Sequence, residues 1–530
     1  MLLRTICAVV LVMCICAAPY EVKFIADQRI TTKDNITLVA DGYVPITTNS
    51  SQTFPILIFP NSWALPQFEY ILKCLQLAER GYITLEYETR GWYRSGGEID
   101  VAGLLDQADI GSVIDYAFSK AAEWQLDTTK VGMVGISYGA GLSLFGAATD
   151  NRVSAVASLS GWANISNALY ENDTPNAVWG TLLVASAHLL GHVNASLDIM
   201  FQDLINHRNM TVVQSYSESR SPLLYLEHIN KRNIPVFLSN NFLDRLFKPQ
   251  DMLSFYEKLT TPKMILLNQG SHAEAEATGL VDLTNYVWHN TIEWMDYFLM
   301  GINNGIVQNP PVQFQELGSE TRIFYPTWPD KEKVTPVTFY LNNRGANEYG
   351  GLSYNPTSRK RVQDVFDTMT YSSSTGMGDG IPIISDYLDE FIPITANLPT
   401  ISRTSAIVYL SQPTNESLLL CGTPSFQVSI FPNSPSWQLY AYLYDVDIFG
   451  IGTLMTDAFY TNYGTSIPSQ EVYVAADMHS LCQRVGSGRR LAIGFDLYNG
   501  LYTQSNSNSS LQVTMFYGED TFLTLPINYL

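Results

Sequence analysis

The pentapeptide GISYG at residues 135–139 has the residue types and spacing of a serine nucleophile on a tight turn. It follows an apolar run, residues 130–136, that is typical of a buried strand, and it precedes a helical pattern of small residues. A serine at such a strand-to-helix turn has a strained backbone, and the flanking glycines remove side chains that would clash there. The turn raises the hydroxyl above the sheet edge, beside the N–H groups that begin the helix. We therefore predict that Ser137 attacks a carbonyl carbon.

A serine nucleophile of this kind needs a carboxylate and then a histidine, in the chain order Ser, Asp or Glu, His. Of the seven histidines, only His272 lies in a loop directly after a predicted strand. The acid is expected in the loop after the preceding strand, residues 234–238, where Asp244 lies; Asp251, in the next helix, is the alternative. In the predicted triad, Asp244 orients the imidazole of His272, which takes the proton of Ser137.

An oxyanion needs a second hydrogen-bond donor besides the backbone N–H of Tyr138. The loop after the first core strand, residues 59–64, is the expected source, and Asn61 is its candidate donor through a backbone or side-chain N–H. Trp63 in the same loop and Trp162 further along the chain are candidate residues of the substrate pocket. A plain connecting loop is the alternative interpretation of residues 59–64.

The elements that must position these residues alternate between strand and helix. An antiparallel hairpin is predicted at residues 22–45, and after it short apolar runs alternate with helical patterns. This alternation predicts a parallel sheet with helices on both faces. Between residues 162 and 232 only helical patterns occur, which predicts a cap over the strand ends. The predicted core strands are residues 54–59, 82–87, 130–136, 153–159, 234–238 and 264–267.

From about residue 337, helical periodicity fades and short β-rich segments appear, separated by Gly, Pro, Asn and Ser. This pattern predicts an all-β sandwich or jelly roll. We therefore expect an α/β domain at residues 19–330 and a C-terminal β-domain at residues 335–530, joined by a linker near residues 327–335.

The N-terminus is typical of a secretory signal peptide, residues 1–18, with a basic Arg4 and an uncharged apolar run at residues 6–18. The run is shorter than the roughly 20 residues that a membrane span needs, so we expect cleavage after Ala18 and no stable membrane anchor. An uncleaved anchor is the alternative. Eight N-x-S/T sequons point the same way, and we expect a secreted glycoprotein, in the medium or in a lysosomal or phagosomal lumen.

The net charge of −20, with 30 Lys and Arg against 50 Asp and Glu, makes the chain a poor candidate for binding nucleic acid. Cys421 and Cys482 fall in one C-terminal region and are able to form a disulfide, whereas Cys74 in a helical pattern is expected to be a buried thiol. No CxxC or clustered Cys/His pattern indicates a metal, and we expect no cofactor. The sequence leaves the oligomeric state open.

Residues 82–97 resemble the loop D-x-R-G-x-G-x-S-x-G of the Xaa-Pro dipeptidyl-peptidase and cocaine-esterase family of serine hydrolases. Glu88 replaces the Asp of that pattern and Tyr93 its second Gly. The turn at residues 135–139 resembles the same family, and so does the order of the domains. The resemblance covers nearly the whole chain after the signal peptide.

The resemblance implies an α/β-hydrolase core with an inserted helical cap and a C-terminal jelly roll. It also implies a triad of Ser137, Asp244 and His272, with an oxyanion N–H from Tyr138. In such enzymes the β-domain helps to wall the acyl pocket, and a tyrosine hydroxyl from the loop after the first core strand lies in the oxyanion hole. Here that loop reads PNSW at residues 60–63, without a tyrosine.

We predict a secreted serine hydrolase that cleaves an ester or amide bond in a small ester or short peptide, with an Xaa-Pro dipeptide as one option. A dipeptidase must hold a free N-terminal ammonium, so it needs carboxylates near the pocket; Glu171 and Asp173 are the candidates. The alternative is a catalytically inactive hydrolase-fold protein that binds a ligand or carbohydrate through its β-domain. Degenerate hydrolases usually lose the Ser or the His, whereas Ser137, Asp244 and His272 are all present in order.

Overall fold

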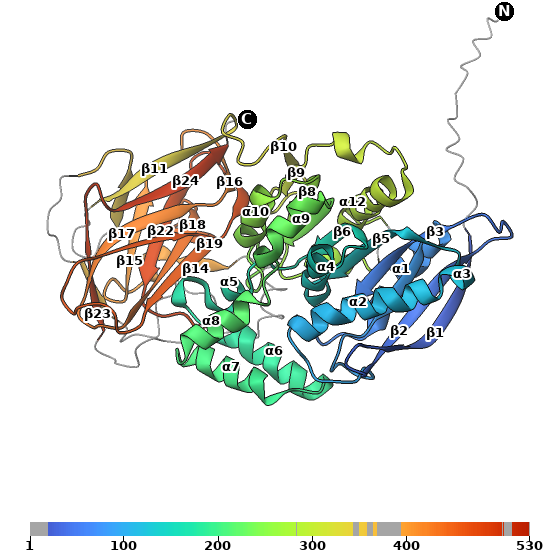
Figure 1. Ribbon diagram of the computed structural model, residues 1–530. Coiled ribbons are helices and arrows are strands. Elements are labelled where there is room, and N and C mark those ends of the chain that lie inside the picture. Colours follow the sequence, from blue (N-terminus) through green and yellow to red (C-terminus); the bar gives the residue numbers. More distant parts are fainter. Residues whose placement is uncertain are drawn as a thin grey trace, which may run out of the picture.

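The computed structural model describes residues 20–281, 284–342, 349–357, 364–367, 394–500, 502 and 511–528. The described chain forms two domains that lie beside each other, one with a mixed sheet flanked by helices and one made of strands (Figure 1). The predicted signal peptide, residues 1–18, and the sequon at Asn508 lie outside the described residues. Within the described ranges, no helix has both the length and the apolar character that crossing a membrane requires.

The α/β domain is built on a ten-stranded sheet in the order β1-β2-β4-β3-β5-β6-β7-β8-β9-β10. The strands from β4 to β9 are parallel, while β1, β2 and β10 add antiparallel edges. Central strands such as β3 and β6 are almost entirely buried, because helices cover both faces of the sheet. The predicted parallel sheet is confirmed. The strands are β1 Glu21–Thr31, β2 Thr37–Ile46, β3 Phe54–Pro60, β4 Ile83–Tyr87, β5 Leu126–Ile136, β6 Val153–Leu159, β7 Val236–Asn241, β8 Lys263–Asn268, β9 Val312–Gln315 and β10 Arg322–Tyr325.

Two groups of helices cover the two faces of this sheet. Helices α2, α4 and α10 contribute Ile110, Leu142 and Leu253 to one buried cluster. Helices α1 and α12 contribute Cys74 and Trp288 to the cluster on the other face, so Cys74 is the buried thiol that the sequence predicts. These helices are α1 Ile71–Glu79, α2 Leu104–Ser119, α3 Ala121–Trp124, α4 Tyr138–Thr149, α10 Pro249–Lys258, α11 Glu274–Thr278 and α12 Tyr286–Met295, with short helices η1 Gln67–Tyr70, η4 Asp296–Met300 and η5 Ile306–Gln308.

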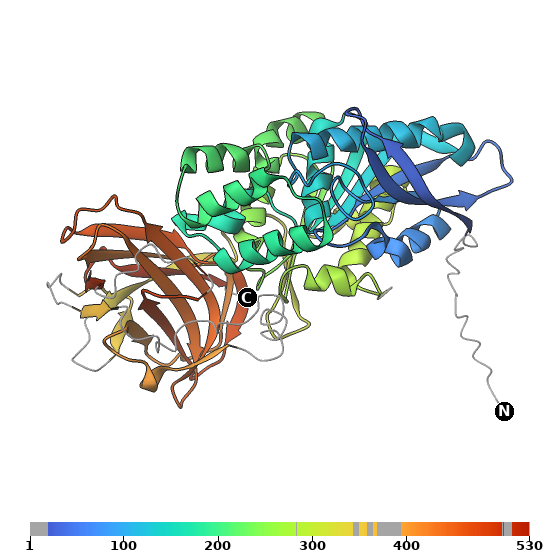
Figure 2. The same cartoon turned by 90° about the horizontal axis from the view of Figure 1, so that it is seen from below.

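The predicted cap is confirmed as a group of helices inserted between β6 and β7, which are neighbours in the sheet. Three cap helices begin at an asparagine whose side chain accepts a hydrogen bond from the first turn: Asn164, Asn176 and Asn194. Figure 2 shows the cap helices between the β-domain and the N-terminal strands. They are α5 Ile165–Tyr170, η2 Glu171–Asp173, α6 Ala177–Leu190, α7 Ala195–Ile205, α8 Met210–Glu218, η3 Pro222–Tyr225 and α9 Leu226–Arg232.

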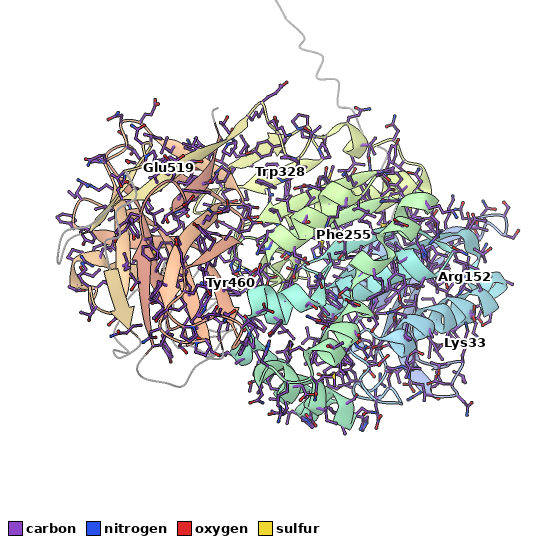
Figure 3. All side chains as sticks on the ribbon, turned by 60° about the vertical axis from the view of Figure 1, so that its left-hand side comes forward. Lys33, Arg152, Phe255, Trp328, Tyr460 and Glu519 are labelled. Atoms are coloured by element: carbon purple, nitrogen blue, oxygen red, sulfur yellow. A yellow bond between two sulfur atoms is a disulfide. The ribbon has the colours of Figure 1, made fainter. Side chains whose placement is uncertain are left out.

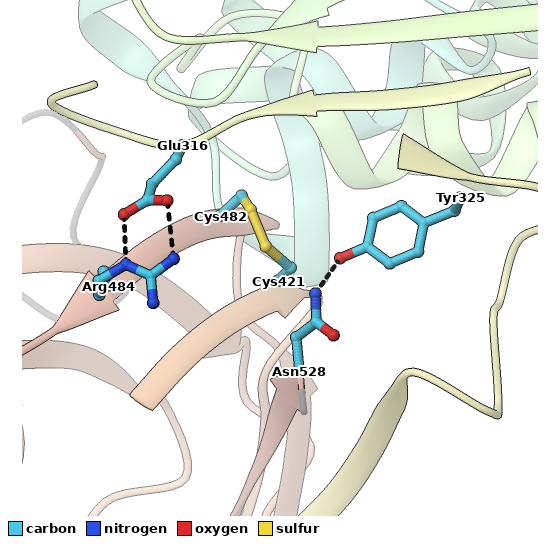
Figure 4. Close-up of a disulfide and its surroundings, with 6 residues drawn as sticks. All are labelled: Glu316, Tyr325, Cys421, Cys482, Arg484 and Asn528. Carbon is cyan, nitrogen blue, oxygen red and sulfur yellow. Dashed lines mark hydrogen bonds and ion pairs between the residues drawn. A yellow bond between two sulfur atoms is a disulfide. The ribbon is translucent and has the colours of Figure 1, made fainter. Parts of the chain in front are cut away.

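The C-terminal domain consists of β-strands around its own apolar core, as the sequence predicts. Cys421 of β16 and Cys482 of β21 face each other on paired strands and form a disulfide (Figure 4). The strands are β11 Val334–Asn342, β12 Gly350–Ser353, β13 Asp364–Asp367, β14 Thr395–Asn397, β15 Ala406–Ser411, β16 Leu418–Gly422, β17 Ser425–Pro432, β18 Trp437–Val446, β19 Ile451–Asn462, β20 Val472–Asp477, β21 Leu481–Val485, β22 Arg490–Asp496, β23 Gln512–Phe516 and β24 Phe522–Asn528, with the short helix η6 Leu398–Thr400.

Polar contacts near this disulfide join the two domains. Arg484 of β21 donates to both carboxylate oxygens of Glu316, which follows β9, at 2.8 and 3.1 Å. Asn528 of β24 donates to the hydroxyl of Tyr325 in β10 at 2.8 Å (Figure 4). Trp328, which Figure 3 labels, lies in the connection between the domains. Its ring packs against that of Tyr325. The β9–β10 hairpin, at the edge of the sheet, is therefore a point of contact between the two domains.

A buried charge cluster makes a second junction, between the cap and the β-domain. His479 of the β-domain contacts Asp457 at 3.1 Å and Glu171 of the cap at 3.4 Å, and Glu171 also pairs with Lys248 at 3.3 Å. Burial alone would lower the pKa of His479, but Asp457 and Glu171 raise it to about 9. Against the effect of burial, Lys248 and His479 hold the pKa of Glu171 at about 2.

The raised pKa of His479 predicts a pH-dependent stability. Because the imidazole has an ordinary pKa of 6.5 and about 9 in the folded chain, its charge stabilises the fold fully below pH 6.5. This stabilisation, about 3 kcal/mol, is lost as the pH rises through about 9. The melting temperature of His479→Gln should therefore lie well below that of the wild type at pH 6 and approach it at pH 9.5. A gap that is independent of pH would contradict this account.

Candidate active site

Ser137 lies on the sharp turn between β5 and α4, with φ 54° and ψ −114°. This left-handed backbone is costly for a residue with a side chain, by roughly 1–3 kcal/mol. The flanking glycines make the turn possible. A Cβ on Gly135 would lie 2.3 Å from the carbonyl carbon of Gly139, and one on Gly139 would lie 2.3 Å from the carbonyl oxygen of Pro60. The sequence pattern GISYG thus produces the strand-to-helix turn that it predicts.

The structure brings Ser137, His272 and Asp244 together at the carboxyl ends of β5, β8 and β7. The hydroxyl oxygen of Ser137 lies 2.9 Å from Nε2 of His272. Nδ1 of the same imidazole lies 2.7 Å from Oδ2 of Asp244. Both distances are those of hydrogen bonds, so the arrangement can move a proton from the serine hydroxyl to the imidazole beside a buried carboxylate.

Asp244 is fixed by the backbone of its own loop. Its Oδ1 accepts hydrogen bonds from the N–H groups of Leu246 and Phe247 at 2.9 and 2.8 Å, and the side chain is buried. Asp251, the alternative acid, instead accepts from the backbone N–H groups of Ala163 and Asn164 at 3.1 and 3.0 Å. Asp251 therefore holds the start of the cap.

Neighbouring groups also fix the orientation of His272. The rings of Phe247 and Trp179 meet the imidazole edge to face, with centroids 5.1 and 5.7 Å away. The hydroxyl of Ser160, after β6, accepts from the backbone N–H of Ala273 at 3.1 Å and so holds the loop of His272. Sequence reasoning missed Ser160, because no local pattern tells which serine bonds a loop more than 100 residues away.

Tyr138 begins α4, so its backbone N–H has no acceptor within the helix and is available to an oxyanion on Ser137. Its side chain is fixed from both sides. The hydroxyl donates to Oδ2 of Asp106 at 2.7 Å and accepts from the N–H of Ala102 at 2.7 Å. Burial, with the charge of Asp100 as a smaller cause, raises the pKa of Asp106 to about 7.

The expectation that Asn61 supplies an oxyanion donor is wrong. Its side-chain amide donates to the carbonyls of Ser62 and Leu65 at 3.0 and 2.7 Å. Its backbone N–H donates to the carbonyl of Tyr87 at 3.1 Å. Asn61 thus uses both kinds of N–H to fold its own loop and to join β3 to β4. A short amide side chain at a strand end is as well suited to such turns as to ligands, so the sequence pattern did not separate the two.

Trp63 occupies the loop position at which the resemblance implies a tyrosine hydroxyl. Its indole Nε1 donates to the carbonyl of Leu183 and to the hydroxyl of Ser186, both at 3.1 Å and both on cap helix α6. The indole N–H is therefore not an oxyanion donor; it ties the loop to the cap. The ring itself lines both cavities that reach Ser137, as predicted for a pocket residue.

The first of these cavities lies under the cap and has a volume of about 110 Å³. Trp162 lines it and stacks on Tyr138 with ring centroids 6.1 Å apart. That Trp162 contacts the substrate stays a prediction. None of the described residues that line this cavity carries a charge. The cavity suits an uncharged, apolar group attached to the carbonyl that Ser137 attacks.

The second cavity, of about 450 Å³, opens on the other side of Ser137 and includes His272. Its described wall is mostly apolar, and Glu69 and Glu274 are its acidic residues. Glu171, a predicted ammonium-binding carboxylate, lines neither cavity at Ser137 and belongs to the charge cluster described above. Asp173 is likewise absent from the described walls.

The described β-domain residues do not wall either cavity at Ser137, contrary to what the resemblance implies. The β-domain instead meets the loop that carries Asp244. Arg245 and Leu243 of that loop line a separate cavity of about 190 Å³ together with Thr456 and His479 of the β-domain. The β-domain therefore lies next to the loop that carries Asp244.

Two family models match the chain in the order of its two domains. The model described as "X-Pro dipeptidyl-peptidase (S15 family)" matches residues 34–274. The model described as "X-Pro dipeptidyl-peptidase C-terminal non-catalytic domain" matches residues 304–475. The chain is also similar to a protein of Bacillus cereus named "Putative Xaa-Pro dipeptidyl-peptidase", at 25% identity over 296 residues. That match covers 51% of this chain and 48% of the relative, so the matched part is about half the length of the curated relative.

Two solved structures have the same fold over 96% of this chain. One is an aminopeptidase from a marine sediment archaeon, with a TM-score of 0.71, 12% identity and 97% of that chain covered. The other is a CocE/NonD family hydrolase from Staphylococcus aureus, with a TM-score of 0.73, 11% identity and 94% of that chain covered. At such low identity the likeness shows the fold, an α/β-hydrolase domain followed by an all-β domain.

The geometry predicts which carboxylate supports the reactivity of Ser137. A fluorophosphonate probe labels a serine that is activated by its neighbouring base. Asp244→Asn should slow the labelling of Ser137 by roughly 10³-fold or more, because the imidazole loses its orienting anion. Asp251→Asn is the matched control; it should keep the labelling rate and lower the thermal stability of the cap. Equal labelling of Asp244→Asn and the wild type would show that the acid is elsewhere.

Proposed function

Because the chain belongs to the Xaa-Pro dipeptidyl-peptidase and cocaine-esterase-like family of hydrolases, we propose that it is a serine hydrolase that works through an acyl-enzyme on Ser137. The observation that carries the proposal is the pair of hydrogen bonds that connects Ser137, at the N-terminus of α4, to His272 and His272 to Asp244. Ser137 lines two cavities, and His272 lines the larger of them.

In the proposed reaction, Nε2 of His272 takes the proton of the Ser137 hydroxyl while the oxygen attacks the carbonyl carbon of the substrate. The backbone N–H of Tyr138 and the N-terminal end of α4 stabilise the oxyanion. The imidazolium, held by Asp244, then gives its proton to the departing oxygen or nitrogen. Water, activated by the same imidazole, attacks the acyl-enzyme and releases the acid. These steps account for an ester and for an amide alike.

The cavity under the cap favours an apolar acyl group. It is uncharged along its described wall, and it is small, so a short aliphatic or aromatic acyl chain is the best match. The larger cavity beside His272 is then the place of the leaving group. We accordingly propose an ester of an apolar acid as the preferred substrate.

An Xaa-Pro dipeptide is the second candidate, since both family models and the Bacillus relative bear that description. Such a substrate brings an N-terminal ammonium about two residues from the scissile bond. Glu171 pairs with Lys248 and His479, and Glu69 and Glu274 are the acidic residues in the described walls of the two cavities at Ser137. The apolar cavity therefore weighs against a charged dipeptide in the acyl position.

The assay compares two substrates on the full chain: an aryl ester of a short aliphatic acid and an Xaa-Pro anilide. Ester turnover should exceed anilide turnover, and Ser137→Ala should lower it by about 10³-fold or more. Ser254→Ala, an exposed serine on α10, is the control and should keep full turnover. Preferred cleavage of the anilide would overturn the substrate class, and turnover that survives Ser137→Ala would overturn the mechanism.

We also propose that the protein is secreted, on the basis of the signal-like sequence at residues 1–18. Sequencing the N-terminus of protein recovered from the medium of its own cells tests this. Recovery of a chain that begins at Pro19 is expected, and a cell-retained chain that begins at Met1 would contradict it.

A further inference from the structure

Glu69 is an acidic residue whose place in the site follows from the structure and from no sequence motif. It lies in η1, directly before α1, and lines the larger cavity together with Ser137 and His272. Its side chain is half-buried. Burying the charged form of a carboxyl group in a mostly apolar cavity costs free energy. A carboxyl group that lies there beside a nucleophile and its base is therefore a candidate for a role in the site.

The contacts of Glu69 connect it to the turn that carries the nucleophile. Its Oε1 accepts the backbone N–H of Ser62, in the loop after β3. The hydroxyl of Ser62 donates to the carbonyl of Ile136 at 3.0 Å, the residue directly before Ser137. The N–H of Ile136 in turn donates to the hydroxyl of Tyr70, the neighbour of Glu69, at 2.9 Å. Glu69 and Tyr70 thus clamp the loop at residues 61–65 to the nucleophile turn.

This clamp also fixes the peptide that leads into Trp63, because the N–H of Ser62 is held by Glu69 and the carbonyl of Ser62 accepts from the amide of Asn61 at 3.0 Å. The loop approaches the head of α4 closely, where the carbonyl of Pro60 leaves no room for a Cβ on Gly139. The negative charge of a tetrahedral intermediate would develop between this loop and α4. Glu69 lines the same cavity as Ser137, next to this loop.

We propose that Glu69 is a positioning residue of the acyl-transfer site, and that the site is active while this carboxyl is uncharged and loses activity when it ionises. The proposal rests on the proposed function, since it concerns acylation of Ser137. The uncharged carboxyl keeps the Ser62 loop in place without repelling the oxyanion. The ionised carboxyl holds the same loop but places a second negative charge in the cavity that the oxyanion shares, where charges interact strongly.

The groups around Glu69 agree with an uncharged carboxyl at neutral pH. Burial raises its pKa to about 8, against the opposing effect of the Ser62 N–H. Lys73, one turn further along, directs its ammonium to Gln76 and the ring of Trp288. The other ionisable groups that face Glu69 from the packed elements are Tyr70, Cys74, Glu86 and Tyr93, with His272 and Glu274 across the cavity.

The sign of the pH effect follows from these groups. Burial raises the pKa of Tyr70 and of Cys74 well above their ordinary values, so both stay neutral near pH 8. Burial also raises the pKa of Glu86 to about 8, but Glu86 lies outside the cavity at Ser137 and accepts a hydrogen bond from Tyr43. The charge on Glu69 is therefore the one that appears inside the cavity as the pH rises through 8.

The test is the pH profile of kcat/KM for a neutral ester between pH 7 and pH 9.5. The wild type should lose about tenfold between pH 7 and pH 9, the drop expected when the ionised form of one group with a pKa near 8 is inactive. Glu69→Gln keeps the acceptor for Ser62 and cannot ionise, so its profile should stay level over this range. Glu86→Gln is the matched control and should retain the decline.

A second variant tests the positioning role. Glu69→Leu removes the acceptor for the Ser62 N–H and should lower kcat about tenfold or more with little change in KM, whereas Glu69→Gln should keep kcat at pH 7. If Glu69→Leu does not fold, the profile of Glu69→Gln decides alone. A Glu69→Gln profile that declines like the wild type overturns the proposal, and so does full kcat in a folded Glu69→Leu. Ser137→Ala distinguishes failure of this proposal from failure of the proposed function. Ester turnover that survives Ser137→Ala overturns the proposed function.

Discussion

The left-handed backbone of Ser137 is the constraint on which the arrangement of the site depends. A residue with a side chain pays roughly 1–3 kcal/mol to adopt such a conformation, and it persists only where its surroundings leave no alternative. Here Gly135 and Gly139 have no side chain that would clash, and the carbonyl of Pro60 fills the space that a Cβ on Gly139 would need. The N–H of Ser137 is held by the carbonyl of Leu159 in β6. The turn therefore places the hydroxyl at one point relative to β6, β7 and β8, where the acid and base loops begin.

Several other elements of the molecule surround the Ser137 hydroxyl or hold the elements that do. The loop after β3 borders it through Ser62 and Trp63, and the indole of Trp63 joins that loop to cap helix α6. The cap closes the apolar cavity, which in the proposed reaction receives the acyl group. The described residues of the β-domain line neither cavity at Ser137; His479 of this domain joins Glu171 and Lys248 in a charge cluster that holds the cap in place.

The meeting of Ser137, Asp244 and His272 was predictable because each lies within a few residues of the end of a recognisable strand, and parallel strands bring their carboxyl ends to one edge. Their catalytic role stays a prediction. The fold was predictable for the same reason: strands such as β3 and β6 are continuous apolar runs between turn residues. The oxyanion loop was not, since Asn61 has the same residue type whether it bonds a ligand or its own turn. Glu69 and Ser160 were missed because their partners lie in other elements, and sequence spacing carries no signal for such contacts.

The central claim is that Ser137 carries the acyl group during turnover, and mass spectrometry of a trapped intermediate tests it most directly. The full chain is mixed with an activated aryl ester, quenched in acid within the first turnovers and digested. We predict that the peptide with residues 135–139 gains the mass of the acyl group, with the modification on Ser137. Turnover of the ester with that peptide unmodified, or with the acyl group on another residue, would contradict the account.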